Sequence, residues 1–147
     1  MSEPAGAAGD APLILYDGVC GLCNRLNRFV LERDGGRFRF AALQSPLARE
    51  ILTRHGRDTR DLDTLYLVLA RGRPDERLLR KSDAALWILR ALGGPWRAAG
   101  ALRLVPRAVR DLGYDLVART RYRVFGRYGA CPLPDPRHRA RFLDQSG

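Results

Sequence analysis

The sequence predicts an α/β fold whose elements follow the order β-α-β-α-β-β-α, with additional helices towards the C-terminus. Two observations support this order. Short runs of strand length recur at residues 13–16, 37–41, 64–69 and 77–80. Longer segments with helical spacing of apolar residues stand between or after them. A chain of 147 residues is also long enough to bury the core of one domain.

The first part of the chain predicts a β-α-β unit. Residues 1–12 are small and polar, which predicts a flexible tail before the domain at 13–147. Residues 13–16 are a continuous apolar run that enters a turn, as a buried strand does. From Gly21 apolar residues recur at helical spacing until the Asp-Gly-Gly sequence at 34–36. Residues 37–41 alternate between arginine and apolar side chains and predict the second strand.

The middle of the chain predicts a helix followed by a β-hairpin. Ser45 is a candidate N-cap, and Pro46 suits the first turn of a helix that should run to about His55. Residues 64–69 are the most apolar strand, and residues 77–80 should return as its antiparallel partner.

The last part predicts helices. Ser82 should cap a helix over residues 83–92, and a helical extension should begin at about residue 95 and include residues 106–125. A β-α-β crossover, a helix, a hairpin and a closing helix together form the layout of a thioredoxin-like domain.

Composition and charge exclude several classes of protein. The 26 Lys+Arg residues against 16 Asp+Glu give a net charge of +10, and all but Lys81 of the basic residues are arginine. No nucleic-acid motif accompanies this charge, so we expect a solvated surface and no specific nucleic-acid partner. The basic, partly amphipathic residues 96–110 predict at most weak contact with an anionic surface. The longest apolar runs have six residues, far short of the roughly 20 of a membrane span.

Targeting and cysteine usage suggest a compartment. The N-terminus lacks the basic start and apolar stretch of a secretory signal. Three cysteines are too few, and an odd number, for a secreted disulfide scaffold. We therefore expect a protein of the reducing cytoplasm.

The sequence from Asp17 to Cys23 carries the strongest chemical signal. Cys20 follows a predicted strand and turn, and it opens a predicted helix. The unpaired N–H groups at a helix N-terminus lower the pKa of a thiol and favour its nucleophilic thiolate. Cys23 lies nearly one helical turn later, so its sulfur should lie beside that of Cys20. Cys20 can therefore attack a substrate disulfide, and Cys23 can resolve the mixed disulfide.

Two other interpretations of these cysteines stay open. Both could be buried, inert side chains. They could also form half of a zinc site, although a structural zinc site normally needs two close-spaced pairs. The candidate zinc ligands are Cys20, Cys23, Cys131, His55 and His138.

The motif also supports a resemblance. The sequence Leu-Tyr-Asp-Gly-Val-Cys-Gly-Leu-Cys-Asn at 15–24 resembles the DCC family of predicted thiol-disulfide oxidoreductases. The likeness extends over about residues 13–143 and includes the Lys-Ser-Asp-Ala-Ala sequence at 81–85 and residues 105–107 and 122–127. The resemblance implies thiol–disulfide exchange, without naming a substrate.

Asp17 has two interpretations. A carboxylate three residues before the nucleophile disfavours the thiolate by its charge, but it could accept the proton of Cys23 when that thiol resolves the mixed disulfide. Alternatively, Asp17 could bond the backbone N–H groups of the turn between strand and helix.

Two further residues are notable. Asp63 stands where thioredoxins have a cis-proline, so we expect a trans bond there and a different substrate pocket. Cys131 has no evident partner in the sequence, and we expect a structural role for it.

Together these features predict a thiol-disulfide oxidoreductase that needs no organic cofactor or metal. Its catalytic residues would be Cys20, Cys23 and Asp17. Its partner would be a protein or low-molecular-weight compound with a thiol or disulfide. The alternative is a non-catalytic thioredoxin-like binding module, stabilised by zinc or associated with an anionic surface.

Overall fold

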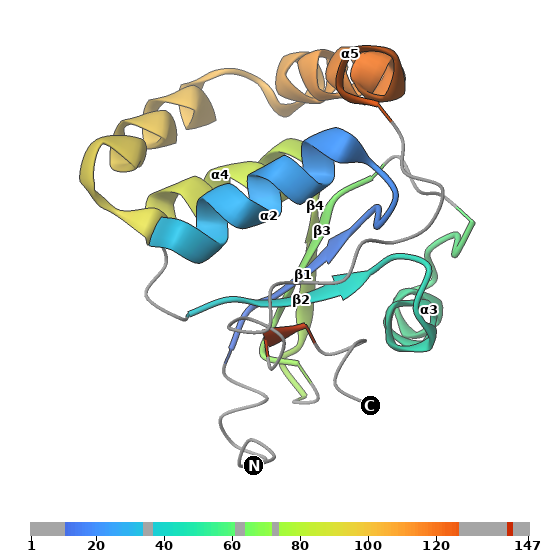
Figure 1. Cartoon of the computed structure of the whole chain (residues 1–147). Coiled ribbons are helices and arrows are strands. Elements are labelled where there is room, and N and C mark those ends of the chain that lie inside the picture. The colour runs from blue at the N-terminus through green and yellow to red at the C-terminus, as the bar shows by residue number, and fades with distance from the viewer. Residues whose placement is uncertain (1–10, 34–36, 61–63, 72–73, 127–140, 143–147) are drawn as a thin grey trace.

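A mixed β-sheet lies at the centre of the molecule (Figure 1). In this computed structural model the described residues are 11–33, 37–60, 64–71, 74–126 and 141–142. Within them the strand order is β2-β1-β3-β4. β1 (Leu13–Tyr16) pairs in parallel with β2 (Arg39–Ala42) and antiparallel with β3 (Tyr66–Leu69). β3 pairs antiparallel with β4 (Arg77–Arg80). The predicted α/β, thioredoxin-like fold is confirmed.

Helices cover both faces of the sheet because successive strand side chains point to opposite sides. Ile14 and Tyr16 of β1 belong to the core under α2 (Gly21–Arg33) and α4 (Lys81–Leu92). Leu13 and Leu15 belong to the core under α3, Pro46–Arg54. Figure 1 shows α2 and α4 together on one side and α3 on the other. The central strands are therefore buried on both faces, as their continuous apolar runs predicted.

One of the two predicted helix caps is correct. The Ser45 hydroxyl accepts a hydrogen bond from the Ala48 N–H at 3.2 Å, with Pro46 as the first residue of α3. The prediction that Ser82 caps α4 is wrong. The helix begins at Lys81, and the Ser82 hydroxyl instead donates to Asp111 at 2.5 Å.

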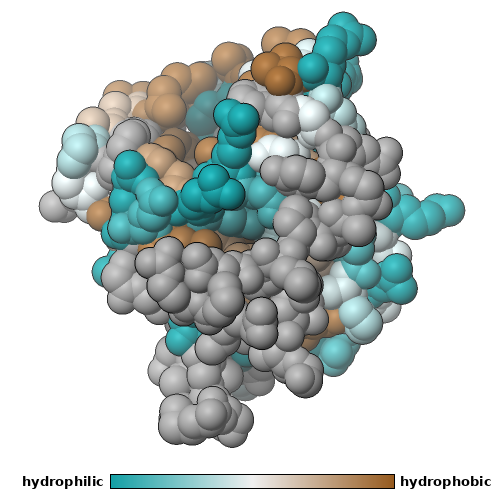
Figure 2. Space-filling model, viewed as in Figure 1, coloured by the Kyte–Doolittle hydropathy of each residue, from teal (hydrophilic) through white to brown (hydrophobic). Residues whose placement is uncertain are grey.

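Two further elements follow the sheet domain. The 3₁₀ segment η1 (Gly94–Leu104) packs along α4, and α5 (Arg107–Phe125) contacts both α4 and α2. η1 and α5 expose many apolar side chains to solvent. Figure 2 shows hydrophobic residues along the upper edge of the molecule, over these two elements. The most exposed of these residues are Leu104, Val124, Leu112, Val109 and Leu116.

The edge of the sheet contains two features that the sequence pattern did not indicate. Phe142 is buried and stacks on Phe40 of β2, with ring centroids 4.9 Å apart. Pro12, predicted to end a flexible tail, is buried, and its carbonyl accepts a hydrogen bond from the Arg39 N–H at 2.8 Å. The chain is thus already tied to the sheet one residue before β1. Within the described residues no helix combines the length and apolarity that crossing a membrane requires.

Candidate active site

The predicted dithiol lies between the end of β1 and the start of α2. Asp17 directly follows β1, and its backbone carbonyl accepts a hydrogen bond from the Cys20 N–H at 3.2 Å. Cys20 precedes the first residue of α2, and Cys23 is the third residue of that helix. This tight turn places both sulfur atoms at the helix N-terminus, where the helix dipole favours an anion.

The two cysteines contact each other. Both thiols are free, and the Cys23 N–H donates a hydrogen bond to the Cys20 Sγ at 3.3 Å. The side-chain hydrogen bond from Cys23 lowers the pKa of Cys20 to about 6, helped by backbone N–H groups and the positive charge of Arg121 against the opposing effect of burial. The same bond and burial raise the pKa of Cys23. The site therefore holds one thiolate beside one protonated thiol at neutral pH.

The two thiols differ in how far the protein covers them. Cys20 has no exposed surface, whereas Cys23 is half-buried and lines a neighbouring cavity. A substrate disulfide can reach the Cys20 Sγ only after the chain around it opens locally.

Asp17 is the polar centre of the site and is 1% exposed. Its Oδ1 accepts hydrogen bonds from the Val19 N–H at 3.1 Å and from the Gln44 side chain at 2.8 Å. Its Oδ2 accepts from Arg121 at 3.0 Å and from the Tyr122 hydroxyl. Burial alone would raise the pKa of Asp17, but these four donors lower it. Because a carboxylate has about four acceptor positions, all of them are occupied.

Arg121 and Tyr122 are site residues that the sequence analysis missed. Arg121 is 3% exposed, and its guanidinium lies over the Tyr122 ring, 4.4 Å from the centroid. Burial and the bond to Asp17 raise the pKa of Tyr122 to about 12, so its hydroxyl stays a donor. Little in the sequence pointed to either residue. Tyr122 lies within a longer stretch that carried the family resemblance, and Arg121 is one of many arginines.

Further bonds fix the loop around the dithiol. Asn24 donates from its side-chain amide to the carbonyls of Gly18 at 3.0 Å and Cys20 at 2.8 Å. The Gly21 N–H donates to the carbonyl of Gly126 at 3.1 Å, so the end of α5 lies against the start of α2. Gly126 has a φ of 84°, a conformation that favours glycine.

The Lys-Ser-Asp sequence at the start of α4 holds the first half of α5. Lys81 pairs with Asp115 at 3.0 Å, and Asp83 accepts a hydrogen bond from Arg110 at 3.1 Å. The Ser82–Asp111 bond lies between them. The structure thus gives this sequence a docking role.

Other residues that the sequence analysis singled out are not part of the described site. Asp63, Cys131 and His138 lie outside the described residues. His55 is half-buried at the end of α3, and its Nε2 lies 2.6 Å from Glu76 rather than near the dithiol. Among the described residues no three His, Cys, Asp or Glu side chains come together in a way that could hold a metal ion.

Comparison with known proteins places this arrangement in a family. The family described as DCC1-like thiol-disulfide oxidoreductase matches residues 14–127. The chain belongs to this family. It is 37% identical over 132 residues to YuxK of Bacillus subtilis, an uncharacterized protein, covering 89% of this chain and 93% of YuxK. No solved structure matches the chain significantly.

A plant relative extends the comparison. The chain is 40% identical over 124 residues to a chloroplastic DCC family protein of Arabidopsis thaliana, covering 83% of this chain and 69% of the plant protein. Membership in the DCC1-like family supports a general redox role for the chain.

Proposed function

We propose that this DCC1-like protein catalyses thiol–disulfide exchange through Cys20 and Cys23. One observation carries the proposal: at a helix N-terminus the Cys23 N–H contacts the Cys20 Sγ at 3.3 Å, and the side-chain hydrogen bond from Cys23 lowers the pKa of Cys20 to about 6. Such a thiol is largely ionised at neutral pH and attacks disulfides faster than an ordinary cysteine.

The reaction has two balanced steps. The Cys20 thiolate attacks one sulfur of a substrate disulfide, forms a mixed disulfide and releases the other substrate sulfur as a thiolate, which takes up a proton. The Cys23 thiol then loses its proton and attacks the Cys20 Sγ, which releases the second substrate thiol. Two electrons pass from the dithiol to the substrate disulfide, and a Cys20–Cys23 disulfide remains. The steps run in reverse when the protein oxidises a substrate dithiol.

Asp17 acts in this proposal as a positioning residue. Its carboxylate holds Arg121, whose positive charge helps to lower the pKa of Cys20. The Arg121 cation thereby offsets the negative charge that Asp17 brings near the thiolate. With its acceptor positions engaged, Asp17 has no evident position left for a proton from Cys23.

We further propose a reducing compartment and a protein or small-molecule thiol partner. The cytoplasmic location of this chain is part of the proposal, because the plant relative is by its name a chloroplastic protein. Three other expectations stay predictions: contact of residues 96–110 with an anionic surface, stabilisation by zinc, and a non-catalytic binding role.

The test uses two matched variants in a Cys131→Ser background. Reduction of a small disulfide substrate, oxidised glutathione, is followed by mass spectrometry. Cys20→Ser should abolish exchange, and Cys23→Ser should accumulate a mixed disulfide on Cys20. Trapping on Cys23 in Cys20→Ser would reverse the roles. Exchange that persists in both variants would refute the proposal.

A further inference from the structure

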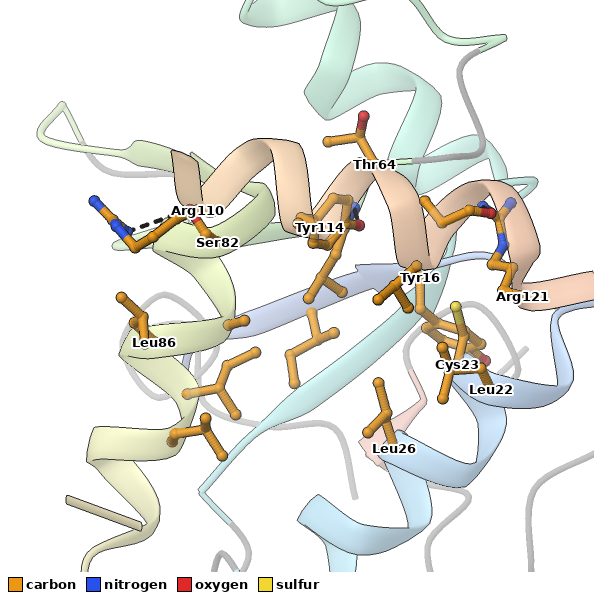
Figure 3. A pocket seen from close by; sticks show the side chains of 18 of the residues that line it. Tyr16, Leu22, Cys23, Leu26, Thr64, Ser82, Leu86, Arg110, Tyr114 and Arg121 are labelled. Carbon is orange, nitrogen blue, oxygen red and sulfur yellow. Dashed lines mark hydrogen bonds between the residues drawn. The ribbon is translucent and has the colours of Figure 1, made fainter. Parts of the chain in front are cut away.

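A large cavity lies beneath α5, beside the dithiol. It measures about 600 Å³, is open to solvent on one side, and is lined by residues of α2, α4, η1 and α5 and by β1. The polar contacts of α5 lie along its first half, where the Tyr114 hydroxyl accepts a hydrogen bond from the Leu65 N–H at 2.6 Å, and again near its C-terminal end. Figure 3 shows Cys23 and Arg121 at one end of the cavity and Ser82 and Arg110 at the other. α5 is thus anchored along its first half and near its C-terminal end, beside a space that the core does not fill. This volume falls within the range of sites for small organic ligands, about 300–1,000 Å³.

The wall of the cavity is overwhelmingly apolar. Aliphatic side chains of all four surrounding elements line it, among them Leu26, Leu86, Leu102 and Val117. The charged residues among the described lining residues are Asp17, Arg110 and Arg121, and each has an opposite charge within 3.1 Å. Because these charges are already neutralised, the cavity favours an uncharged ligand over an anion or a cation.

The wall contains a polar group, the Asn27 amide nitrogen, that has no hydrogen-bond partner within the described part of the chain. Asn27 of α2 lines the cavity and is 6% exposed. Among the described residues no hydrogen-bond acceptor lies within reach of its Nδ2. A buried amide N–H without a partner is destabilising, and native proteins rarely keep one without a reason. A ligand oxygen in the cavity would satisfy it.

We propose that this cavity binds a neutral, mainly apolar small molecule that carries a carbonyl or hydroxyl oxygen, and that this oxygen accepts a hydrogen bond from Asn27 Nδ2. The apolar part of the ligand would occupy the space between α2, α4, η1 and α5. This binding does not depend on the redox activity of Cys20 and Cys23, so either proposal can fail without the other.

Gly113 offers a direct way to block the cavity. It lies within α5 and lines the cavity, and a Cβ built on it meets no atom within 4 Å. Glycine also weakens a helix interior. Gly113 is itself exposed, so Gly113→Phe should place its ring in the mouth of the cavity and block it, with a melting temperature at or above that of the wild type. Gly113→Ala strengthens the helix equally without blocking the cavity and is the matched control.

The experiment titrates the full-length protein with Nile red, a neutral apolar dye with a carbonyl group, and displaces the dye with 2-alkanones of increasing length. We expect saturable binding and a gain of about fourfold in affinity per added methylene until the cavity is full. Gly113→Ala should bind like the wild type, and Gly113→Phe should lose binding. If Gly113→Phe lowers the melting temperature, Gly113→Leu replaces it.

A second variant tests the oxygen contact. Asn27→Leu removes the amide while keeping its approximate shape. The variant should weaken the binding of a 2-alkanone about two- to tenfold more than the binding of the isosteric 2-methyl-1-alkene, which has no oxygen. Equal loss for both compounds would refute the role of Asn27. Non-saturable binding, binding that survives in Gly113→Phe, or binding lost only in Leu104→Ser on the exposed face would overturn the cavity proposal.

Discussion

The Arg121 guanidinium lies 3.0 Å from the Asp17 carboxylate, and both side chains are almost fully withdrawn from solvent. The pair joins the loop that carries the dithiol to α5, across 104 positions of sequence. A buried ion pair is stable only while both partners are present, because either charge alone is poorly solvated. The pair therefore ties the integrity of the redox loop to the docking of α5.

Removal of Arg121 should strongly destabilise the fold. Arg121→Met leaves the Asp17 charge buried with its neutral donors only, which should lower the free energy of unfolding by about 3–5 kcal/mol. Urea denaturation at pH 7 measures this loss. The matched control is Arg119→Met, an exposed position on the same helix, which should change stability by less than about 0.5 kcal/mol. Equal effects of the two variants would contradict the structural role of the pair.

Alkylation of Cys20 should titrate near pH 6. Its pKa is lowered to about 6, so the rate of reaction with iodoacetamide should rise through that pH and level off above it. The burial of Cys20 lowers the alkylation rate at every pH. It does not move the midpoint, provided that the chain around Cys20 opens and closes faster than alkylation occurs. Cys23→Ala removes the largest cause of the shift, the side-chain hydrogen bond, and should raise the midpoint. A midpoint near 8.5 in the wild type would show an ordinary thiol.

The local pattern of the chain predicted its strands, its helices and the position of the dithiol, because each depends on residues close in sequence. Contacts between distant residues could not be predicted this way. Nothing in the pattern separates Arg121 from the other arginines, although it is buried and most of the other arginines that the structure describes are exposed. Ser82 was assigned to a local cap because its competing partner, Asp111, comes from a helix 29 positions later. Phe142 was missed for the same reason: an isolated aromatic residue near the end of a chain carries no periodic signal.

Loss of the Ser82 hydroxyl should loosen α5. Ser82 donates to Asp111 at 2.5 Å and accepts from Arg110 at 3.2 Å, so Ser82→Ala leaves two charged groups with one partner fewer. We expect a loss of about 1–3 kcal/mol and faster hydrogen exchange in α5. Ser45→Ala removes a cap of α3 and is the control: it should cost about 0.5–2 kcal/mol without faster exchange in α5. Unchanged exchange in α5 for Ser82→Ala would refute the docking role.

Asp17→Asn separates the two interpretations of Asp17. If Asp17 positions the loop, the variant should lose stability. The amide of asparagine has one acceptor oxygen where the carboxylate has two, and it cannot neutralise Arg121. The pKa of Asp17 is lowered in the fold, so its contribution is fully present above the unfolded pKa of about 4 and is lost as pH falls through the folded pKa. The stability gap between wild type and Asp17→Asn should therefore narrow in acid.

The kinetics of the same variant decide whether Asp17 also relays a proton. Stopped-flow measurements resolve the first attack by Cys20 from the release of the mixed disulfide by Cys23. With four donors already on its oxygens, Asp17 should not accept the Cys23 proton, and release should stay within about threefold of the wild-type rate in the folded fraction. General-base assistance is worth about 10²–10⁴-fold. Release slowed by that amount, with the first attack unchanged, would establish the relay and require Asp17 to exchange at least one of its donors for Cys23 during the reaction.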